Sequence, residues 1–303
     1  MTLTLSQAAL LSTDTLQRGV ITTFAQSSPI LEMLPFMDVS GNSYKYNVEK
    51  ALPGIAFRDV NAGYTASSGE VEQRFESLVI LGGDSDVDRF IVNTRGNVNE
   101  IRAIHTQMKA KALAKQFTKQ FFKGDAAAAA DANHIAIGFD GLDARLVGTS
   151  QELDNTDTEL GGTGGKLTLN ALHTLLDQVN GGADALFMGK AMRRELQKLL
   201  EGQTHYVQVG KDSFGRPIEM FGDVQIRTVE DELLPIDATN GGDIYAIKFG
   251  AMDAVSGLQN GGVSVRDLGE LDTLPVYRTR IEWYVSMAKF HPKAAARLKG
   301  ILR

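Results

Sequence analysis

The sequence predicts an α+β protein, and three observations predict that class. The stretch from Val98 to Lys123, "VNEIRAIHTQMKAKALAKQFTKQFFK", holds no glycine or proline and predicts one long helix. Two strands joined by a long excursion of turn and charged residues are predicted between Gly41 and about Val92. From about Lys166, helical and strand patterns alternate without an internal repeat. Separate helical, ribbon and mixed regions are typical of the α+β class.

Composition limits the kind of protein. The 303 residues, 43% of them hydrophobic, suffice for a sizeable core in one or two domains. The absence of cysteine excludes disulfides, thiolate metal sites and a cysteine nucleophile. A net charge of −6 argues against a dedicated nucleic-acid binder but is compatible with local basic stripes. No apolar run approaches the ~20 residues that span a bilayer, and no signal segment opens the chain, so we expect it to fold in the cytosol without a membrane partner.

The N-terminal segment is expected to be a thin arm. In "STDTLQRGVITTFAQSSPILEMLPF", Asp14 is placed to cap one helix, and Ser28 before Pro29 to cap a shorter one that ends at Pro35. The segment has too few apolar positions to fold alone. The strands "SYKYNVEK" and "FESLVIL" follow it and form a two-stranded sheet with little to bury. An isolated two-stranded sheet is only marginally stable in water, so we expect it to pack against something else.

The helix over 98–123 should be roughly 39 Å long and carries two opposed apolar stripes. Asn97 is placed to cap it, and Gly124 to end it in a left-handed conformation. The first stripe consists of Ile101, Ile104, Met108 and Ala112, and the second of Ala110, Leu113, Ala114, Phe117 and Phe121. We therefore expect the helix to pack against one body early and a different body late. A basic row continues where the first stripe stops, as either a solvated face or a face for a polyanion or an acidic partner; it consists of Lys111, Lys115, Lys119 and Lys123.

The region after about Lys166 is predicted to mix helices and strands. Helices are expected at "LNALHTLLDQV" and "GKAMRRELQKLLE", with the buried strand "ADALFM" between them. Further strands are expected at "HYVQV", "DVQIRTV", "IYAIKFG" and "GVSVRD". The stretch from Val276 is predicted to open as an unusually long strand and to finish as a short polar tail.

Chemical motifs are incomplete. In "GGTGGK", Leu160 and Leu167 stand where a phosphate loop needs glycine and a hydroxyl, so a flexible connection is expected there. "DSDVD", from Asp84, lacks the later ligands of a calcium loop and is expected to be a solvated turn. The five histidines form no ligand pair, and His173 is expected to be a packed core residue. No cofactor, metal or catalytic site is predicted, which argues against an enzyme.

The ordered set of features resembles the major capsid protein of tailed bacteriophages, with its Hong Kong 97-type fold. "SPILEMLPF" resembles the end of that family's N-terminal arm, and "GNSYKYNVEKALPGIAFRDVNAGY" resembles its extended loop, a β-hairpin that lies over a neighbouring subunit. The helix over 98–123 resembles its spine helix, and "FDGL" follows it much as in the family. "RTRIEWYVSMAKFHPKAAARLKG" resembles the long final strand and tail. The resemblance runs over nearly the whole chain.

The resemblance implies five parts. They are an N-terminal arm over 1–39, an extended loop over 40–80, a peripheral domain with a long-stranded sheet over 81–145, an axial mixed α/β domain over 146–268, and a final strand and tail over 269–303 that return to the peripheral domain. Candidate contacts between subunits in the loop are Lys45, Glu49, Arg58, Asp59 and Arg74. The basic row of the helix is expected to face the shell interior, where it would touch scaffold or genome.

The implied function is structural: the chain self-assembles into an icosahedral shell that encloses packaged double-stranded DNA. The implied partners are many copies of the chain in hexamers and pentamers, a portal protein, packaged DNA in non-specific contact, and a decoration protein. Because the arm begins almost at Met1, a scaffolding protein would be a separate chain. The implied location is the virion capsid, assembled in the host cytoplasm.

Some members of the family cross-link covalently. Lys45 and Lys50 are available as donors here, but no asparagine follows Asn260, so no isopeptide mesh is expected. Two alternatives stay open. One is an encapsulin, a nanocompartment of the same fold that houses an enzyme, and the other is a hydrolase whose catalytic residues converge only in three dimensions.

Overall fold

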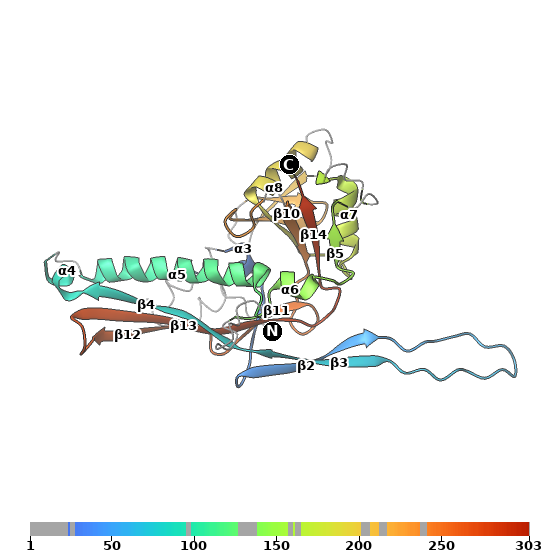
Figure 1. The fold of residues 1–303 in the computed structure, drawn as a ribbon, viewed down its shortest axis with the longest axis horizontal. Coiled ribbons are helices and arrows are strands. Elements are labelled where there is room, and N and C mark those ends of the chain that lie inside the picture. The colour runs from blue at the N-terminus through green and yellow to red at the C-terminus, as the bar shows by residue number, and fades with distance from the viewer. Residues whose placement is uncertain are drawn as a thin grey trace.

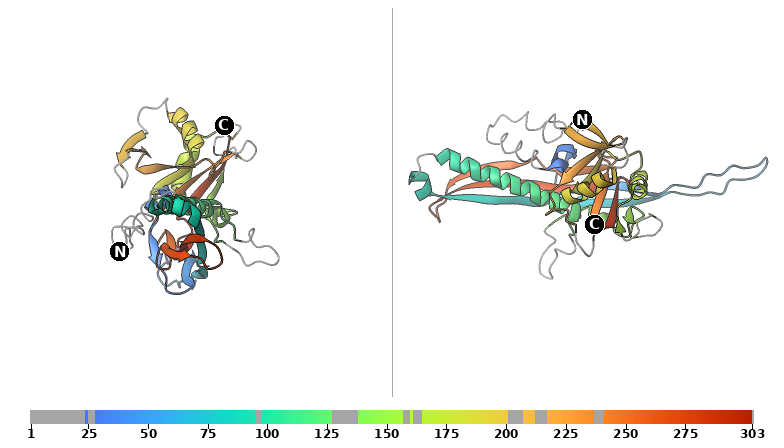
Figure 2. Two further views of the ribbon diagram at one scale, coloured as in Figure 1. Left: turned by 90° about the vertical axis from the view of Figure 1, so that its left-hand side faces the viewer. Right: turned by 90° about the horizontal axis from the view of Figure 1, so that it is seen from above.

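The computed structural model describes residues 24, 28–94, 98–126, 138–156, 160, 165–200, 207–211, 217–236 and 241–302. Figure 1 shows three parts: a ribbon in which a long helix lies along long strands, a lobe of helices and strands above one end of the ribbon, and a hairpin that projects beyond the lobe. The view from above in Figure 2 shows the hairpin and the ribbon reaching in opposite directions. The predicted α+β class is confirmed.

The ribbon is built on a five-stranded sheet. Its strands are β1 (Phe36–Asp38), β11 (Val255–Gln259), β13 (Val276–Lys289) and β12 (Ser264–Glu270), with β4 (Val79–Asp88) paired to β13. The long strand β13 is the axis of this sheet. All of β4 pairs antiparallel with one of its edges, while β12 and β11 pair with successive parts of the other edge. This sheet gives the ribbon its length.

Helix α5 (Val98–Lys123) has the bounds that the sequence predicts, and it follows the short helix α4 (Arg89–Thr94). Its second apolar stripe is buried, as predicted, and Phe117 packs its ring against Trp283 of β13 with centroids 5.0 Å apart. The first stripe behaves differently. Ile104 is 49% exposed and Met108 is 62% exposed, while the side chain of Ile101 lies outside the described part. Among the described residues, α5 therefore has one support instead of the two that were predicted.

The C-terminal end of α5 is fixed by close packing. Gly124 lacks the predicted left-handed backbone, and a Cβ on it would lie 2.3 Å from the Gln120 carbonyl oxygen. Gly141 donates its N–H to the Gly124 carbonyl at 2.8 Å and leads into α6 (Leu142–Leu146). The same Cβ would lie 2.7 Å from the carbonyl oxygen of Phe139, in the segment that crosses the helix end. The glycine is needed here because of these close contacts, and not because the chain turns left-handed. The predicted cap Asn97 lies outside the described residues.

The lobe contains a mixed seven-stranded sheet. Its order is β5 (Glu152–Asp154), β14 (Ala295–Ile301), β10 (Gly242–Ile247), β6 (Ala185–Gly189), β9 (Val224–Val229), β8 (Pro217–Phe221) and β7 (Val207–Lys211). Helices α7 (Leu169–Asp177) and α8 (Lys190–Leu200) both pack on the face that carries Leu186 and Met188. The opposite face, with Phe187, belongs to the same core as the ribbon. Alternate residues of β6 thus serve two different cores.

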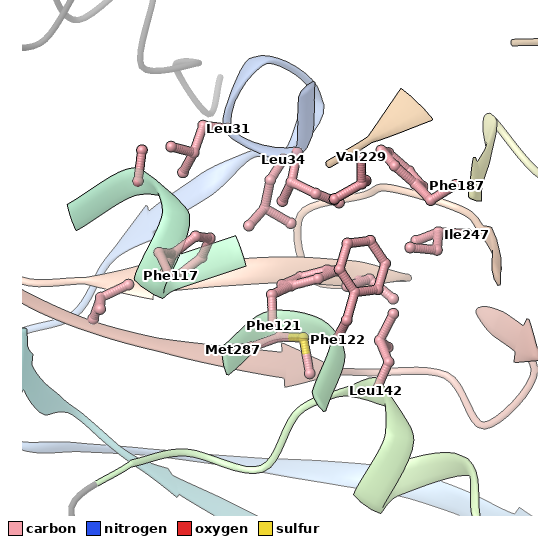
Figure 3. Close-up of a cluster of buried hydrophobic side chains, with 14 of the residues drawn as sticks. Leu31, Leu34, Phe117, Phe121, Phe122, Leu142, Phe187, Val229, Ile247 and Met287 are labelled. Carbon is pink, nitrogen blue, oxygen red and sulfur yellow. The ribbon is translucent and has the colours of Figure 1, made fainter. Parts of the chain in front are cut away.

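Figure 3 shows where ribbon and lobe meet. Phe121 and Phe122 at the end of α5 lie beside Leu142 of α6, and the ring centroid of Phe122 is 5.8 Å from that of Phe187. Every one of these side chains is fully buried. The end of α5 is therefore held firmly between the two sheets.

The end of the chain differs from the prediction. β13 lies in the ribbon, but β14 is an inner strand of the lobe, between β5 and β10, instead of a polar tail. Its Ala295, Leu298 and Ile301 are buried, and small residues such as alanine allow the close packing of an inner strand. Conversely, β11 and β12 start before residue 269 yet belong to the ribbon sheet. The chain crosses between ribbon and lobe more often than the five predicted parts imply.

The described part of the N-terminal arm packs into the core, whereas the sequence predicted a thin arm. Phe24, Ile30, Leu31 and Leu34 are fully buried in the core, and α3 spans Pro29–Met33. Pro29 occupies the first turn as predicted, but the Ser28 hydroxyl bonds the Thr118 hydroxyl at 2.7 Å instead of capping the helix. The predicted Asp14 cap and most of "GGTGGK" lie outside the described residues. None of the described helices is both long and apolar enough to cross a membrane.

Candidate assembly surfaces

The hairpin of β2 (Ser43–Ala51) and β3 (Glu70–Ser77) ends in a long tip, residues 52–69, that projects into solvent (Figure 1). Among the strands that the structure describes, these two pair only with each other. Large apolar side chains on the tip are more than two-thirds exposed, namely Leu52, Ile55, Phe57, Val60 and Tyr64. Clustered exposed apolar groups of this kind mark an interaction surface. Along the tip, the predicted hairpin thus packs against none of the other described residues.

The five charged residues predicted as contacts all lie on this hairpin. Lys45 and Glu49 are exposed on β2, and Arg74 forms an ion pair with Glu72 on the same strand at 3.3 Å. Arg58 and Asp59 lie at the tip. The guanidinium of Arg58 donates to the Ala62 carbonyl at 3.1 Å, and the Asp59 carboxylate accepts the Val60 N–H at 2.9 Å. These bonds shape the tip. Contacts with neighbouring subunits stay a prediction.

The root of the hairpin holds an ionic cluster that the sequence did not reveal. Arg145 of α6 donates to both carboxylate oxygens of Glu76 on β3, and Tyr46 of β2 donates its hydroxyl to the same carboxylate at 3.0 Å. Burial, together with the nearby Glu76 charge, raises the pKa of Tyr46 to about 12. On β13, burial and the cations of Arg74 and Arg145 lower the pKa of Lys289 to about 8. Arg145 and Glu76 are 69 residues apart, so no local sequence pattern predicts their contact.

The aspartates of "DSDVD" form no turn. They lie in β4, opposite β13, where Asp84 accepts two bonds from Arg280 at 2.7 and 2.9 Å and Asp86 accepts two from Arg278. The hydrogen bonds from Arg280 hold the pKa of the Asp84 carboxyl below its usual value. The charges therefore fasten two long strands together.

Exposed apolar side chains at the far end of the ribbon include Phe90, Leu268 and Leu274.

The basic row of α5 divides into two groups. Lys111 and Lys119 are exposed, and Lys115 pairs with Glu230 at 2.6 Å while staying accessible. Lys123 is half-buried and pairs with Asp143 at 2.9 Å and with Asp243. Arg297 of β14 completes this group through Asp243 at 3.1 Å. Lys123 therefore joins helix to lobe instead of continuing an open basic face.

No metal site is found among the described residues, where no three histidine, aspartate or glutamate side chains are grouped to hold an ion. His173 is exposed, contrary to the prediction of a core position, and lies with its ring 5.3 Å from that of Phe221. The helix α7 buries its other face instead.

The candidate site of this chain is a set of surfaces: the bare hairpin tip, the exposed first stripe of α5, and the far end of the ribbon.

These features define a class of protein. A spine helix beside a long antiparallel sheet, an α/β lobe and a projecting hairpin form the Hong Kong 97-type fold of shell-forming proteins, and the solved structures below share it over about nine-tenths of the chain. The family model "Major capsid protein GP7" matches residues 13–175, more than half of the chain. The chain therefore belongs to this family of phage major capsid proteins. As a capsid protein it is a structural protein of the virion and not an enzyme, which removes the hydrolase alternative.

Similar solved structures include two kinds of shell. The holo-SrpI encapsulin complex from Synechococcus elongatus PCC 7942 is 15% identical, with a TM-score of 0.67 over 90% of this chain and 86% of the other. The capsid of a native GTA particle is 13% identical, with a TM-score of 0.65 over 90% of each chain. A chain of Microbacterium phage Oxtober96 is 16% identical, with a TM-score of 0.59 over 89% and 90%. At these identities the likeness shows the fold alone. The comparison with curated sequences gives no match.

Proposed function

We propose that this capsid protein builds an icosahedral shell of hexamers and pentamers around packaged double-stranded DNA. The bare hairpin tip carries the proposal, because its apolar side chains need a neighbouring subunit to cover them. The tip and the far end of the ribbon lie at opposite ends of the molecule (Figure 1), so a contact between them joins subunits head to tail. Head-to-tail contacts close into rings, and rings are the units of such a shell.

The remaining partners belong to the same proposal. A separate scaffolding protein, a portal protein and a decoration protein complete the particle, which assembles in the host cytoplasm. The exposed ammonium groups of Lys111, Lys115 and Lys119 face the interior and contact scaffold or genome. Lys123 is not part of that face, because Asp143 and Asp243 already neutralise it. No isopeptide mesh forms, so a denaturing gel of mature shells shows monomers; a ladder of covalent multimers would refute this.

The test of assembly uses the hairpin. Phe57→Asp places a charge where the tip needs an apolar contact, and we expect subunits that fold but do not assemble. Thr65→Asp is the matched control, since it adds the same charge to the same exposed tip without removing an apolar side chain. Negative-stain microscopy of each protein expressed alone distinguishes cages, tubes or sheets from free subunits. Wild-type protein that stays monomeric at high concentration would overturn the proposal.

The test of content separates DNA from protein cargo. The encapsulin in the comparison is a specific reason to keep the nanocompartment as second candidate. Particles are treated with nuclease, opened, and analysed for protected DNA and for a second protein. Protected DNA supports the phage shell, whereas an enzyme without DNA supports the nanocompartment. Replacement of Lys111, Lys115 and Lys119 by Gln is expected to lower the amount of DNA packaged. Unchanged assembly and DNA packaging would show that these lysines serve only solubility.

A further inference from the structure

The direction of the hairpin depends on side chains at its root. The sheet of β2 and β3 is not hydrogen-bonded to the five-stranded sheet, so no strand pairing aligns the two. An aromatic contact holds one strand, since the Tyr46 ring lies 4.8 Å from Phe290. Apolar and aromatic contacts tolerate small rotations. A bidentate charged pair has fixed angular demands and can restrict such rotations.

Arg145 and Glu76 supply that group. Arg145 Nη2 lies 2.6 Å from Glu76 Oε2 while Nη1 reaches the other oxygen, which is the bidentate arrangement. The same guanidinium donates to the Asp140 carbonyl at 2.9 Å and to the Met287 carbonyl of β13 at 3.1 Å. It therefore holds β3 against α6 and β13 at once. The Arg145 side chain is only 8% exposed and that of Glu76 13%, so water competes little for the pair.

We propose that the pair of Arg145 and Glu76, which we call the root clamp, sets the angle at which the hairpin leaves the body, and that this angle selects a uniform closed shell. The length of the hairpin amplifies small errors. About 15 residues separate Glu76 from the end of the tip, roughly 50 Å at the usual rise of a strand, so a rotation of about 5° moves the tip by about 4 Å. That displacement is enough to misplace an apolar side chain in its pocket on the next subunit. The inference rests on the proposed assembly function.

The hairpin offers a matched control. Glu70 pairs with Lys50 at 3.2 Å, but both side chains are more than 60% exposed and both lie on the hairpin itself. This pair links β2 to β3 and makes no bond to the body. Removal of its charge should therefore leave the hairpin direction unchanged. The root clamp fastens the hairpin to the body, whereas the control pair joins the two strands of the hairpin. Both are salt bridges between a basic and an acidic side chain.

The first experiment measures direction in unassembled subunits. Because the chain has no cysteine, Thr65→Cys at the tip and Asn170→Cys on α7 accept two spin labels without interference. We expect a narrow distance distribution in this background and with Glu70→Gln. With Glu76→Gln we expect a distribution about twofold wider, because the fork loses one charged partner. An unchanged width with Glu76→Gln would overturn the role of the pair in setting direction.

The second experiment measures the product of assembly. Glu76→Asp keeps the charge but shortens the side chain by one methylene group, so it serves where Glu76→Gln folds poorly. We expect subunits with near wild-type circular dichroism and melting temperature but a loss of closed particles of the wild-type diameter, because the shorter carboxylate cannot keep both bonds of the guanidinium in place. Particles of normal diameter and yield from both Glu76 variants would refute the proposal. Failure of the wild-type chain to form particles would instead refute the proposed function, while the spin-label result would still judge the root clamp.

Discussion

Lys289 offers the sharpest test of the electrostatics at the hairpin root. The residue lies at the end of β13, is only 3% exposed, and donates to the Pro292 carbonyl at 3.3 Å. Burial, with the cations of Arg74 and Arg145 nearby, lowers the pKa of Lys289 from 10.5 to about 8. At neutral pH the protein therefore holds a proton on an amine in surroundings that disfavour the charge. Replacement by Met keeps most of the volume and removes that charge.

The magnitude follows from linkage. Each pKa unit corresponds to about 1.36 kcal/mol, so the charged amine costs the folded state about 3 kcal/mol at pH 7. Between pH 8 and 10.5 the unfolded chain binds more protons at this position than the folded chain does. Stability of the wild-type protein therefore rises with pH in this window, and the cost falls to about 1 kcal/mol at pH 9.5. Allowing about 1 kcal/mol for the lost bond to Pro292, we expect Lys289→Met to stabilise the subunit by about 2 kcal/mol at pH 7 and by little or nothing at pH 9.5.

The assay is urea unfolding of unassembled subunits at pH 7 and at pH 9.5. The range stops below pH 10, because the pKa of Tyr46 is raised to about 12 and its titration lowers stability at higher pH. Lys299→Met, on a lysine of β14 that is about one-third exposed, is the control for a general effect of removing positive charge. A Lys289→Met variant less stable than wild type at pH 7, or a difference that grows with pH, would refute the reasoning.

Three further variants test the core and its joints by urea unfolding and soluble yield. Arg227→Ala leaves the Glu32 carboxylate buried without its partner and should cost about 3–5 kcal/mol, whereas a loss below about 1 kcal/mol would show that water reaches the pair. Phe117→Ala opens a cavity against the ribbon sheet and should also cost about 3–5 kcal/mol; a small loss would mean that the helix does not depend on this contact. Gly141→Ala places a Cβ 2.5 Å from the Gln120 carbonyl oxygen and should abolish soluble protein, so normal expression would contradict the close packing seen there.

The elements that the sequence predicted well are those specified by their own residues. α5 has its predicted bounds because 26 residues without glycine or proline favour a helix wherever it packs. β13 is a long strand, as predicted, and its β-branched and aromatic residues alternate with charged ones from Tyr277 to Trp283. Its neighbour β4 shows the limit of this reasoning. Three aspartates in five residues suggest a solvated turn, but they form a strand because β4 pairs along its whole length with β13, almost 200 residues away, whose Arg278 and Arg280 bind two of the carboxylates.

The surfaces were predicted in kind and missed in detail. A hairpin unable to bury itself was expected from its composition, and the tip is bare in the structure. The root clamp was missed, because Arg145 in "LDARL" and Glu76 in "FESLVIL" are ordinary surface patterns when read alone. The same holds for Lys123, which local spacing placed in a basic row and tertiary contacts placed in a joint. Pairs distant in sequence carry no local signal, so their positions follow only from the fold.

The arrangement of ion pairs bears on the proposed assembly. Lys123 with Asp143 and Asp243 joins α5 to the lobe, and the root clamp joins the hairpin to the body. Rigid joints mean that bringing two subunits together orders few additional degrees of freedom, so less of the contact energy is lost to entropy. In the proposed shell, weak apolar contacts at the hairpin tip would then suffice, since each subunit would make several of them at once. Flexible joints with the same bare tips would instead favour irregular aggregates, because every tip would find its partner at a different angle.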